Sequence, residues 1–410
     1  MNRRIDQLYQ EGTIAIADGN LSRGKKLVDK IMALDPLSPM SIELAGDFAR
    51  ASGEIDEALG WYERLTAENF SNEWRGIGFM NIASIHQADR AWDKAIDYFQ
   101  KALQEFLQLQ DQERAWYAKQ TIGEVLLECG RFQQSADTLE KLFDEMRAHP
   151  KRRRFLDDSL DVRRVLAEAY RFIGRMDDSR YQWEKIESIA RKKQNPIQLA
   201  VALDGLGVLC QIQGQYEQAE ELHLESLKLN RNLRDLDGQS VNLGNLARLY
   251  IHLKDWDQAE DYVRKSLKIE LKHENLSGIS FNKLLLAEID IGREKYKDAE
   301  KKLLQLESLM SRQGETDDLL AISSKIGFVY RMMGRLDEAR ERQLRVLEEA
   351  RRMNHADGIP STLDELAEIE LTLGNKQQAK VYWQEALELF EQIGSEKMSQ
   401  QVRSSLDDLE

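Results

Sequence analysis

The sequence is poor in cysteine and proline and contains no long apolar run. Its 410 residues include two cysteines and five prolines. Cys129 and Cys210 stand alone in separate parts of the chain, and lone cysteines are typical of a reducing compartment. No segment approaches the run of about 18 apolar residues that a membrane-spanning helix needs. We therefore expect a cytoplasmic protein without disulfides or membrane insertion. Because the first residues lack an apolar core, we also expect no signal peptide.

Positive charge is also in deficit. Lysine and arginine number 58 against 72 aspartates and glutamates, which gives a formal net charge of −14. Sequence-independent binding of nucleic acid depends on attracting phosphates to cationic side chains. The charge balance therefore argues against a general nucleic-acid binder, and we expect no nucleic-acid partner.

No arrangement of side chains predicts catalysis or metal binding. The six histidines form no i,i+4 pair and have no glutamate at the spacing of a zinc protease. Residues 19–26 nearly match a phosphate-binding loop, but Lys26 stands where a hydroxyl residue would hold magnesium, and no strand precedes it. A serine elbow, a Cys-His pair and a dinucleotide loop are all missing. We expect a non-enzymatic protein that needs no cofactor and no metal.

What the chain does contain is a regular repeat. A small residue recurs at intervals of 34, 37, 40 and 44 residues and then at 40 residues five times. Twelve residues before each of these positions stands another glycine or alanine. A fixed period of this length predicts a stack of helical hairpins. The ten small residues, called marker positions below, are Gly24, Ala58, Ala95, Ser135, Ser179, Ala219, Ala259, Ala299, Ala339 and Ala379.

Each period has the pattern of two amphipathic helices joined by a tight turn. In residues 199–236, for example, two runs of apolar residues at helical spacing flank a central glycine. Seven of the ten turns carry glycine five residues before the marker position, where a left-handed backbone can end the first helix without a Cβ clash. The five prolines fall between the expected hairpins. Pro39 and Pro196 are expected at first helical positions, after Ser38 and Asn195 as N-caps.

These features resemble the tetratricopeptide repeat. The segment 243–250, LGNLARLY, is close to the first-helix signature of that family, and His223 stands where its repeats often carry Tyr-His. The 40-residue period is similar to the repeats of kinesin light chain and of the Pins/LGN spindle-orientation adaptors. The resemblance implies an all-α, right-handed superhelical solenoid of about ten tetratricopeptide hairpins. Residues 394–410 carry an amphipathic stripe after Ser395, and we expect them to form a C-terminal capping helix with Ser395 as its N-cap.

The longest interval contains a basic insertion at residues 147–154. Its length and charge predict a junction between an N-terminal sub-array of repeats one to four, residues 1–150, and a C-terminal sub-array of repeats five to ten, residues 151–393. The insertion is either a solvated loop or a contact for an acidic partner segment or a phosphate-bearing ligand. Its four consecutive cations are Lys151, Arg152, Arg153 and Arg154.

The resemblance also implies a function, that of a non-enzymatic scaffold or adaptor. Members of the family hold a partner peptide or helix in the concave groove that their first helices form. Groove positions lie 18, 15, 11, 8 and 7 residues before each marker position, and acids outnumber bases there. We therefore expect a protein or peptide partner, with basic segments favoured at the acidic stretches, and arginines that hold acidic side chains. The candidate binding residues are Asp204, Asn245, Arg248, Phe281, Glu288, Phe328 and Arg331.

Two alternatives stay open. One is that these side chains only solvate the groove. The other is a peptide-responsive regulator whose array changes shape on ligand binding, similar to the peptide-pheromone receptors of Gram-positive bacteria, which also use 40-residue repeats. Those receptors carry an effector module before the repeats. Here the first repeat begins almost at Met1, so the array itself would be the effector.

Overall fold

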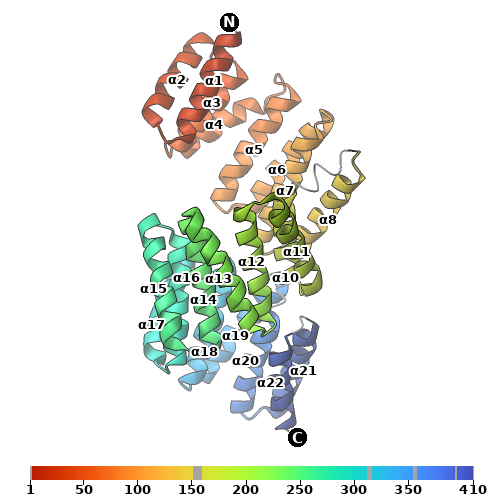
Figure 1. Ribbon diagram of the computed structural model, residues 1–410, viewed down its shortest axis with the longest axis vertical. Coiled ribbons are helices and arrows are strands. Elements are labelled where there is room, and N and C mark those ends of the chain that lie inside the picture. Colours follow the sequence, from red (N-terminus) through yellow and green to blue (C-terminus); the bar gives the residue numbers. More distant parts are fainter. Residues whose placement is uncertain (1, 151–158, 312–315, 354–357, 393–394, 410) are drawn as a thin grey trace. The chain divides into compact units, whose positions relative to one another are not determined.

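The computed structural model describes residues 2–150, 159–311, 316–353, 358–392 and 395–409, and within these ranges it contains 21 helices and no strand (Figure 1). The chain separates into two compact units. The first contains Met1–Cys129 and Asp137–Asp144, and the second contains Gly130–Ala136 and Glu145–Glu410. The division between residues 150 and 151 stays a prediction from the sequence.

Helices follow one another as antiparallel hairpins in both units, so the all-α class and the hairpin stack are confirmed. None of the helices in the described ranges combines the length and the apolar character needed to cross a membrane. The helices of the first unit are α1 (Asn2–Ala17), α2 (Leu21–Leu34), α3 (Pro39–Ala51), α4 (Ile55–Leu65), α5 (Asn72–Ala88), α6 (Trp92–Gln108) and α7 (Gln112–Glu128), and α8 (Phe132–Ala148) contributes to both units. The helices of the second unit are α10 (Leu160–Phe172), α11 (Met176–Lys193), α12 (Pro196–Ile212), α13 (Tyr216–Leu233), α14 (Leu236–His252), α15 (Trp256–His273), α16 (Leu276–Gly292), α17 (Tyr296–Ser311), α18 (Thr316–Met332), α19 (Leu336–Met353), α20 (Gly358–Thr372), α21 (Lys376–Gln392) and α22 (Glu396–Asp407).

A left-handed residue stands five positions before every marker, in the turn between the two helices of a hairpin. Glycine occupies this position in seven turns, with φ between 72° and 87°, as the sequence predicts. The other three turns hold Arg90, Lys254 and Glu294, whose φ values are 56°, 60° and 61°. The hairpin geometry is therefore kept even where a side chain makes this backbone conformation cost about 1 kcal/mol or more.

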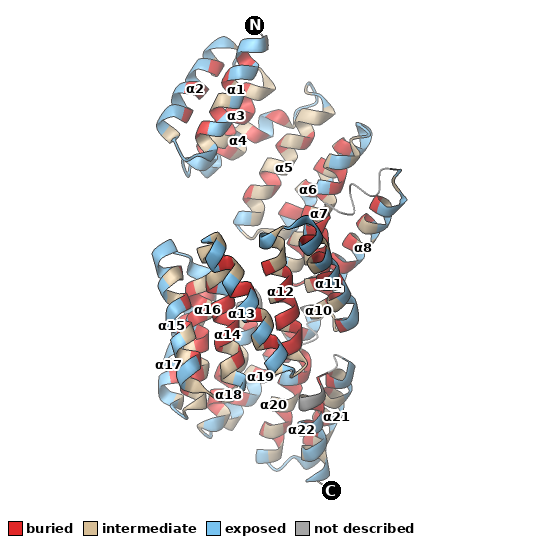
Figure 2. Cartoon of the chain, in the orientation of Figure 1, coloured by how far each residue is buried: buried red, intermediate tan, exposed pale blue. Residues whose placement is uncertain are grey.

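The paired small residues allow the two helices of a hairpin to approach closely. All ten marker residues are buried, and so are the ten small residues twelve positions before them. A Cβ on Gly46 would lie 2.6 Å from Cε1 of Tyr62, and a Cβ on Gly207 would lie 2.7 Å from Cε1 of His223. Figure 2 shows the result, with buried residues along the sides on which neighbouring helices meet. The repeated small residues are thus a packing requirement.

The helix starts agree with most of the sequence-based expectations. Pro39 and Pro196 begin α3 and α12, and the side chain of Asn195 caps α12 by accepting a backbone N–H at 3.2 Å. Ser38 precedes α3 but makes no side-chain cap hydrogen bond. Pro360 lies within the first turn of α20 rather than between hairpins. The first turn tolerates proline because its N–H groups have no partner inside the helix.

The last helix, α22, packs against α21, which confirms the expected C-terminal capping helix. Val402 is fully buried, and the other apolar residues of the stripe, Met398, Leu406 and Leu409, pack against the same core cluster. Ser395 precedes the helix without making a side-chain cap hydrogen bond, and its backbone oxygen accepts the hydroxyl of a helical serine at 3.0 Å. Apolar packing therefore holds this helix in place.

Candidate functional site

The first helices of the second unit form one continuous layer. Each of α10, α12, α14, α16 and α18 contacts the next first helix along the chain, and α20 is the last in this series. Side chains that point away from the second helices therefore share one surface, called the first-helix surface below. All seven binding residues predicted from the sequence lie on the helices of this layer. The predicted basic residues Lys151, Arg152, Arg153 and Arg154 lie outside the described residues.

Asp204 is the centre of a polar network that joins three helices. Its Oδ1 lies 2.7 Å from Nδ1 of His223 and accepts a hydrogen bond of 2.7 Å from Nδ2 of Asn242. Its Oδ2 accepts Nδ2 of Asn245 at 2.9 Å, and the backbone oxygen of Asn245 accepts Nε2 of Gln211 at 2.9 Å. The structure therefore brings the predicted residues Asp204 and Asn245 together. It also fixes the Asn245 amide, which is 9% exposed, in a single orientation.

The predicted arginines are stacked on the predicted aromatic residues. The guanidinium carbon of Arg248 lies 4.9 Å from the ring centroid of Phe281, and that of Arg331 lies 5.1 Å from the ring centroid of Phe328. These distances are typical of cation–π contacts, which hold each guanidinium flat against its ring.

The carboxylates near these arginines also have partners in the chain. Arg331 donates to both oxygens of Glu365, at 3.0 and 3.3 Å, and lies 3.8 Å from Glu368. The predicted residue Glu288 pairs with Lys325 at 3.4 Å. Arg331 is therefore already held by acidic side chains of its own chain. Binding of a partner carboxylate there would have to compete with them.

A first pocket, called the α12 pocket, opens on this surface between α10 and α14 and has a volume of about 340 Å³. Its walls include the exposed apolar side chains of Ile197 and Val241, and its polar lining includes Arg164, Asp204 and Asn242. An apolar cavity with a few fixed polar groups is typical of a site for a small ligand or a peptide side chain.

A second pocket, called the α22 pocket, has a volume of about 620 Å³ and is lined by residues from both ends of the second unit. Arg171, Arg248 and Lys325 come from first helices, whereas Phe390 and Met398 come from the C-terminal end. The surface is therefore not uniformly acidic, because three cations line one pocket. Sequence periodicity gives no sign of this pocket, since its walls are far apart in the chain.

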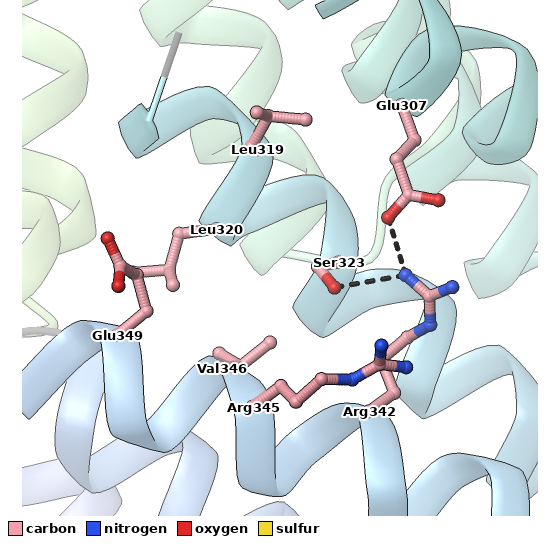
Figure 3. A pocket seen from close by; sticks show the side chains of 8 residues that line it. All are labelled: Glu307, Leu319, Leu320, Ser323, Arg342, Arg345, Val346 and Glu349. Atoms are coloured by element: carbon pink, nitrogen blue, oxygen red, sulfur yellow. Dashed lines mark hydrogen bonds and ion pairs between the residues drawn. The ribbon is translucent and has the colours of Figure 1, made fainter. Parts of the chain in front are cut away.

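A third hollow, of about 440 Å³, lies among α17, α18 and α19 (Figure 3). Arg342 crosses it and donates from Nη1 to Glu307 at 2.5 Å and to the hydroxyl of Ser323 at 3.0 Å. Leu319 and Val346 add apolar surface. Since the arginine is already engaged by its neighbours and no predicted residue lines this hollow, we do not place the site here.

Two carboxyl groups, the buried Glu43 and the half-buried Asp364, have pKa values well above that of an ordinary carboxyl group. In the first unit, Glu43 accepts a hydrogen bond of 2.7 Å from the Tyr9 hydroxyl, and burial is the main cause that raises the pKa of Glu43 to about 7. In the second unit, Asp364 accepts Nε1 of Trp383 at 2.8 Å, and burial raises the pKa of Asp364 to about 6. Within the described residues, no group of three or more histidine, cysteine, aspartate or glutamate side chains is placed to hold a metal ion.

Comparison with known proteins identifies the repeat. The model of the MalT-like TPR region matches residues 159–403, and the tetratricopeptide repeat model matches residues 79–113. No curated protein matches the chain. The apo form of RapI is 12% identical, with a TM-score of 0.59, and the match covers 85% of this chain and 98% of that chain. The Rap conjugation gene regulator of plasmid pLS20, in complex with the Phr* peptide, is 13% identical with a TM-score of 0.59 over 85% of this chain and 96% of that one.

A third solved structure, aspartyl phosphate phosphatase F from Bacillus subtilis, is 13% identical with a TM-score of 0.58, and the match covers 84% of this chain and 93% of that chain. At such identities these likenesses show the fold alone. The family model matches the sequence itself over residues 159–403, which are more than half of the 410 residues. The tetratricopeptide prediction is confirmed, and the chain belongs to the family of MalT-like TPR regions.

Proposed function

We propose that this protein is a non-enzymatic scaffold that binds an extended peptide or a helix of a partner protein on the first-helix surface of its second unit. One observation carries the proposal: the α12 and α22 pockets adjoin on this surface and share Glu168 and Val208 as lining residues. Together they offer a long concavity with apolar walls, fixed amides and charges of both signs. Such a surface suits a peptide better than a small metabolite.

The polar groups on this surface support a peptide ligand. Asn245 carries an amide held by Asp204, and Arg248 presents a guanidinium flat on Phe281. Held in this way, both groups lose little conformational freedom on binding. Acidic groove positions outside the two pockets, such as Asp161, favour lysine or arginine in the partner, whereas the cations of the α22 pocket favour its acidic groups. A cytoplasmic location is part of the same proposal and rests on the two lone cysteines.

A display library of random peptides selected on the immobilised full chain tests the proposal. Enriched peptides are then measured by fluorescence polarisation against the wild type, Asn245→Ala and Arg248→Ala. Each substitution should weaken binding about tenfold, because one lost hydrogen bond or ion pair in a binding site is worth roughly 1.4 kcal/mol. Lys268→Ala, an exposed change on α15, is the matched control and should leave binding unchanged. Equal affinities for all four proteins would place binding elsewhere.

A catalytic role is tested in parallel. Because one structural neighbour is named an aspartyl phosphate phosphatase, the purified chain should be assayed for release of phosphate from an acyl phosphate. We expect no turnover above that of buffer. Turnover that survives repeated purification would contradict the non-enzymatic proposal.

The alternative of a peptide-responsive regulator is favoured by one observation. The α22 pocket is lined by α10, α12 and α14 on one side and by α20, α21 and α22 on the other, so a ligand there would link the two ends of the second unit. Small-angle scattering with and without a saturating selected peptide tests this. A change in the radius of gyration would favour the regulator, and an unchanged scattering profile would favour the passive scaffold.

A further inference from the structure

The residue four positions after the marker lies on the second helix and, where it can donate a hydrogen bond, usually finds its acceptor on the first helix of the same hairpin. Five hairpins carry a polar donor at this position, and four of the five donors are satisfied in this way. The contacts are Tyr62 Oη to Asp47 Oδ1 (2.6 Å), His223 Nδ1 with Asp204 Oδ1 (2.7 Å), Gln343 Nε2 to the backbone oxygen of Ser324 (3.0 Å) and Trp383 Nε1 to Asp364 Oδ1 (2.8 Å).

Trp183 is the exception. Its side chain is 2% exposed, and its indole Nε1 is buried without a hydrogen-bond partner. The reason lies in the sequence, since Arg164 occupies the place, fifteen residues before the marker, that Asp364 fills in the hairpin of Trp383. A guanidinium carries only donors and cannot accept the indole N–H. A buried donor without an acceptor is rare in folded proteins and calls for an explanation.

Trp183 and Arg164 both line the α12 pocket. The indole packs directly on the backbone of Gly205, where an added Cβ would lie 2.3 Å from Cε2 of Trp183, so α12 has no side chain there to cover the ring. The pocket thus combines an unmet N–H donor and a cation at positions where another hairpin pairs an N–H donor with a carboxylate.

The carboxylates that line the pocket each have partners within the chain. Glu168 pairs with Arg171 at 3.0 Å, and Asp204 is bound by the network described above. Asp235 accepts the backbone N–H of Gly238 at the start of α14. None of them hydrogen-bonds to the indole of Trp183, so the missing acceptor is not supplied by the described part of the chain.

We propose that the α12 pocket binds a carboxylate of the partner peptide. This carboxylate accepts the Nε1 proton of Trp183 and pairs with Arg164, in the place that Asp364 fills in the hairpin of Trp383. The apolar walls formed by Ile197 and Val241 hold the adjoining apolar side chain of the peptide. The inference rests on the proposed function, and it assigns to Trp183 and Arg164 the recognition of an acidic group.

Three synthetic peptides distinguish the source of the carboxylate. They are an apolar pentapeptide with a free C-terminal carboxylate, its C-terminal amide, and the amide with one central aspartate. The readout is the ¹H–¹⁵N resonance of the Trp183 indole in the full chain, assigned through Trp183→Phe. We expect a downfield shift of this resonance with one or both carboxylate peptides and none with the plain amide. The peptide that causes the shift shows whether the C-terminus or a side chain supplies the carboxylate.

An internal acceptor provides the second test. Arg164→Asp should move the Trp183 indole resonance downfield without any peptide and should weaken binding of the active carboxylate peptide at least tenfold. Lys228→Ala, an exposed change on α13, is the control and should change neither. Equal shifts with all three peptides, no shift with any of them at millimolar concentration, or unchanged binding by Arg164→Asp would overturn the inference. The proposed scaffold function would then still be judged by its own display selection, because peptides enriched there need not occupy this pocket.

Discussion

Replacing Glu43 with glutamine should stabilise the first unit at pH 8 but not at pH 4. Glu43 is 9% exposed, and its carboxyl accepts the Tyr9 hydroxyl at 2.7 Å. Burial is the main cause that raises the pKa of Glu43 from 4.5 to about 7. The folded state therefore holds this proton more tightly than the unfolded chain does. The stability that protonation contributes is complete below pH 4.5 and is lost as the pH rises through about 7.

The size of the effect follows from the two pKa values. The difference between 4.5 and about 7 corresponds to roughly 3 kcal/mol in the free energy of unfolding at alkaline pH. Glutamine keeps an oxygen that can accept the Tyr9 hydroxyl and carries no charge to desolvate. The gain of Glu43→Gln over the wild type should therefore approach, but not exceed, roughly 3 kcal/mol at pH 8 and should vanish near pH 4.

Amide hydrogen exchange along α1 to α4, measured in the full chain at several pH values, is the suitable assay, because a repeat array need not unfold in a single step. Glu63→Gln, an exposed change on α4, is the control and should leave exchange protection unchanged. A gain of the same size at pH 4 and pH 8 would mean that charge burial is not the cause. Weaker exchange protection of Glu43→Gln than of the wild type at pH 8 would refute the prediction.

Three further predictions concern the turns, the hairpin packing and the junction. By amide hydrogen exchange of the affected hairpins, Glu294→Gly should raise the free energy of unfolding by up to about 1 kcal/mol and Gly374→Ala should lower it by about 1 kcal/mol, because both residues have a left-handed backbone that glycine adopts without strain. A change of the same sign in both variants would contradict this explanation. Gly207→Ala should lower the free energy of unfolding by roughly 2 kcal/mol, because its Cβ would lie 2.7 Å from the buried ring of His223. Gly60→Ala has no neighbour within 4 Å and should be neutral or slightly stabilising, and the reverse order in the same assay would contradict this. Limited trypsin digestion should cut first within residues 151–154 and leave two fragments that remain associated. First cleavage between two C-terminal repeats would contradict the prediction that the basic insertion separates two sub-arrays.

Most of the fold could be predicted because its packing rules act locally and recur. A small residue at each marker position and glycine in seven turns leave a periodic trace that one sequence displays by itself. The turns of Arg90, Lys254 and Glu294 show where that trace is interrupted, since the rest of the hairpin imposes the left-handed backbone without glycine. The position of Pro360 inside α20 differs from the prediction because a helix can begin two residues before a proline.

The site could be predicted only in part. The sequence named Asp204, Asn245, Arg248 and Phe281 as separate candidates, and their role in binding stays a prediction. The structure adds that Asp204 lies beside Asn245 and Arg248 beside Phe281, because the first helices of adjacent hairpins pack against each other. Trp183 was missed, although its place four residues after a marker was visible in the sequence. The α22 pocket could not have been found, because its walls belong to hairpins separated by most of the second unit.

The five equal intervals of 40 residues bear on how this chain tolerates changes in length. Where successive hairpins repeat at one spacing, a duplication or deletion of a whole period leaves every remaining junction in register. Folding alone therefore allows the second unit to gain or lose hairpins. The α22 pocket does not, because α20–α22 line it together with α10, α12 and α14, and one hairpin more or fewer would separate its walls. The α22 pocket thus requires a fixed number of hairpins in the second unit, whereas the repeat itself does not.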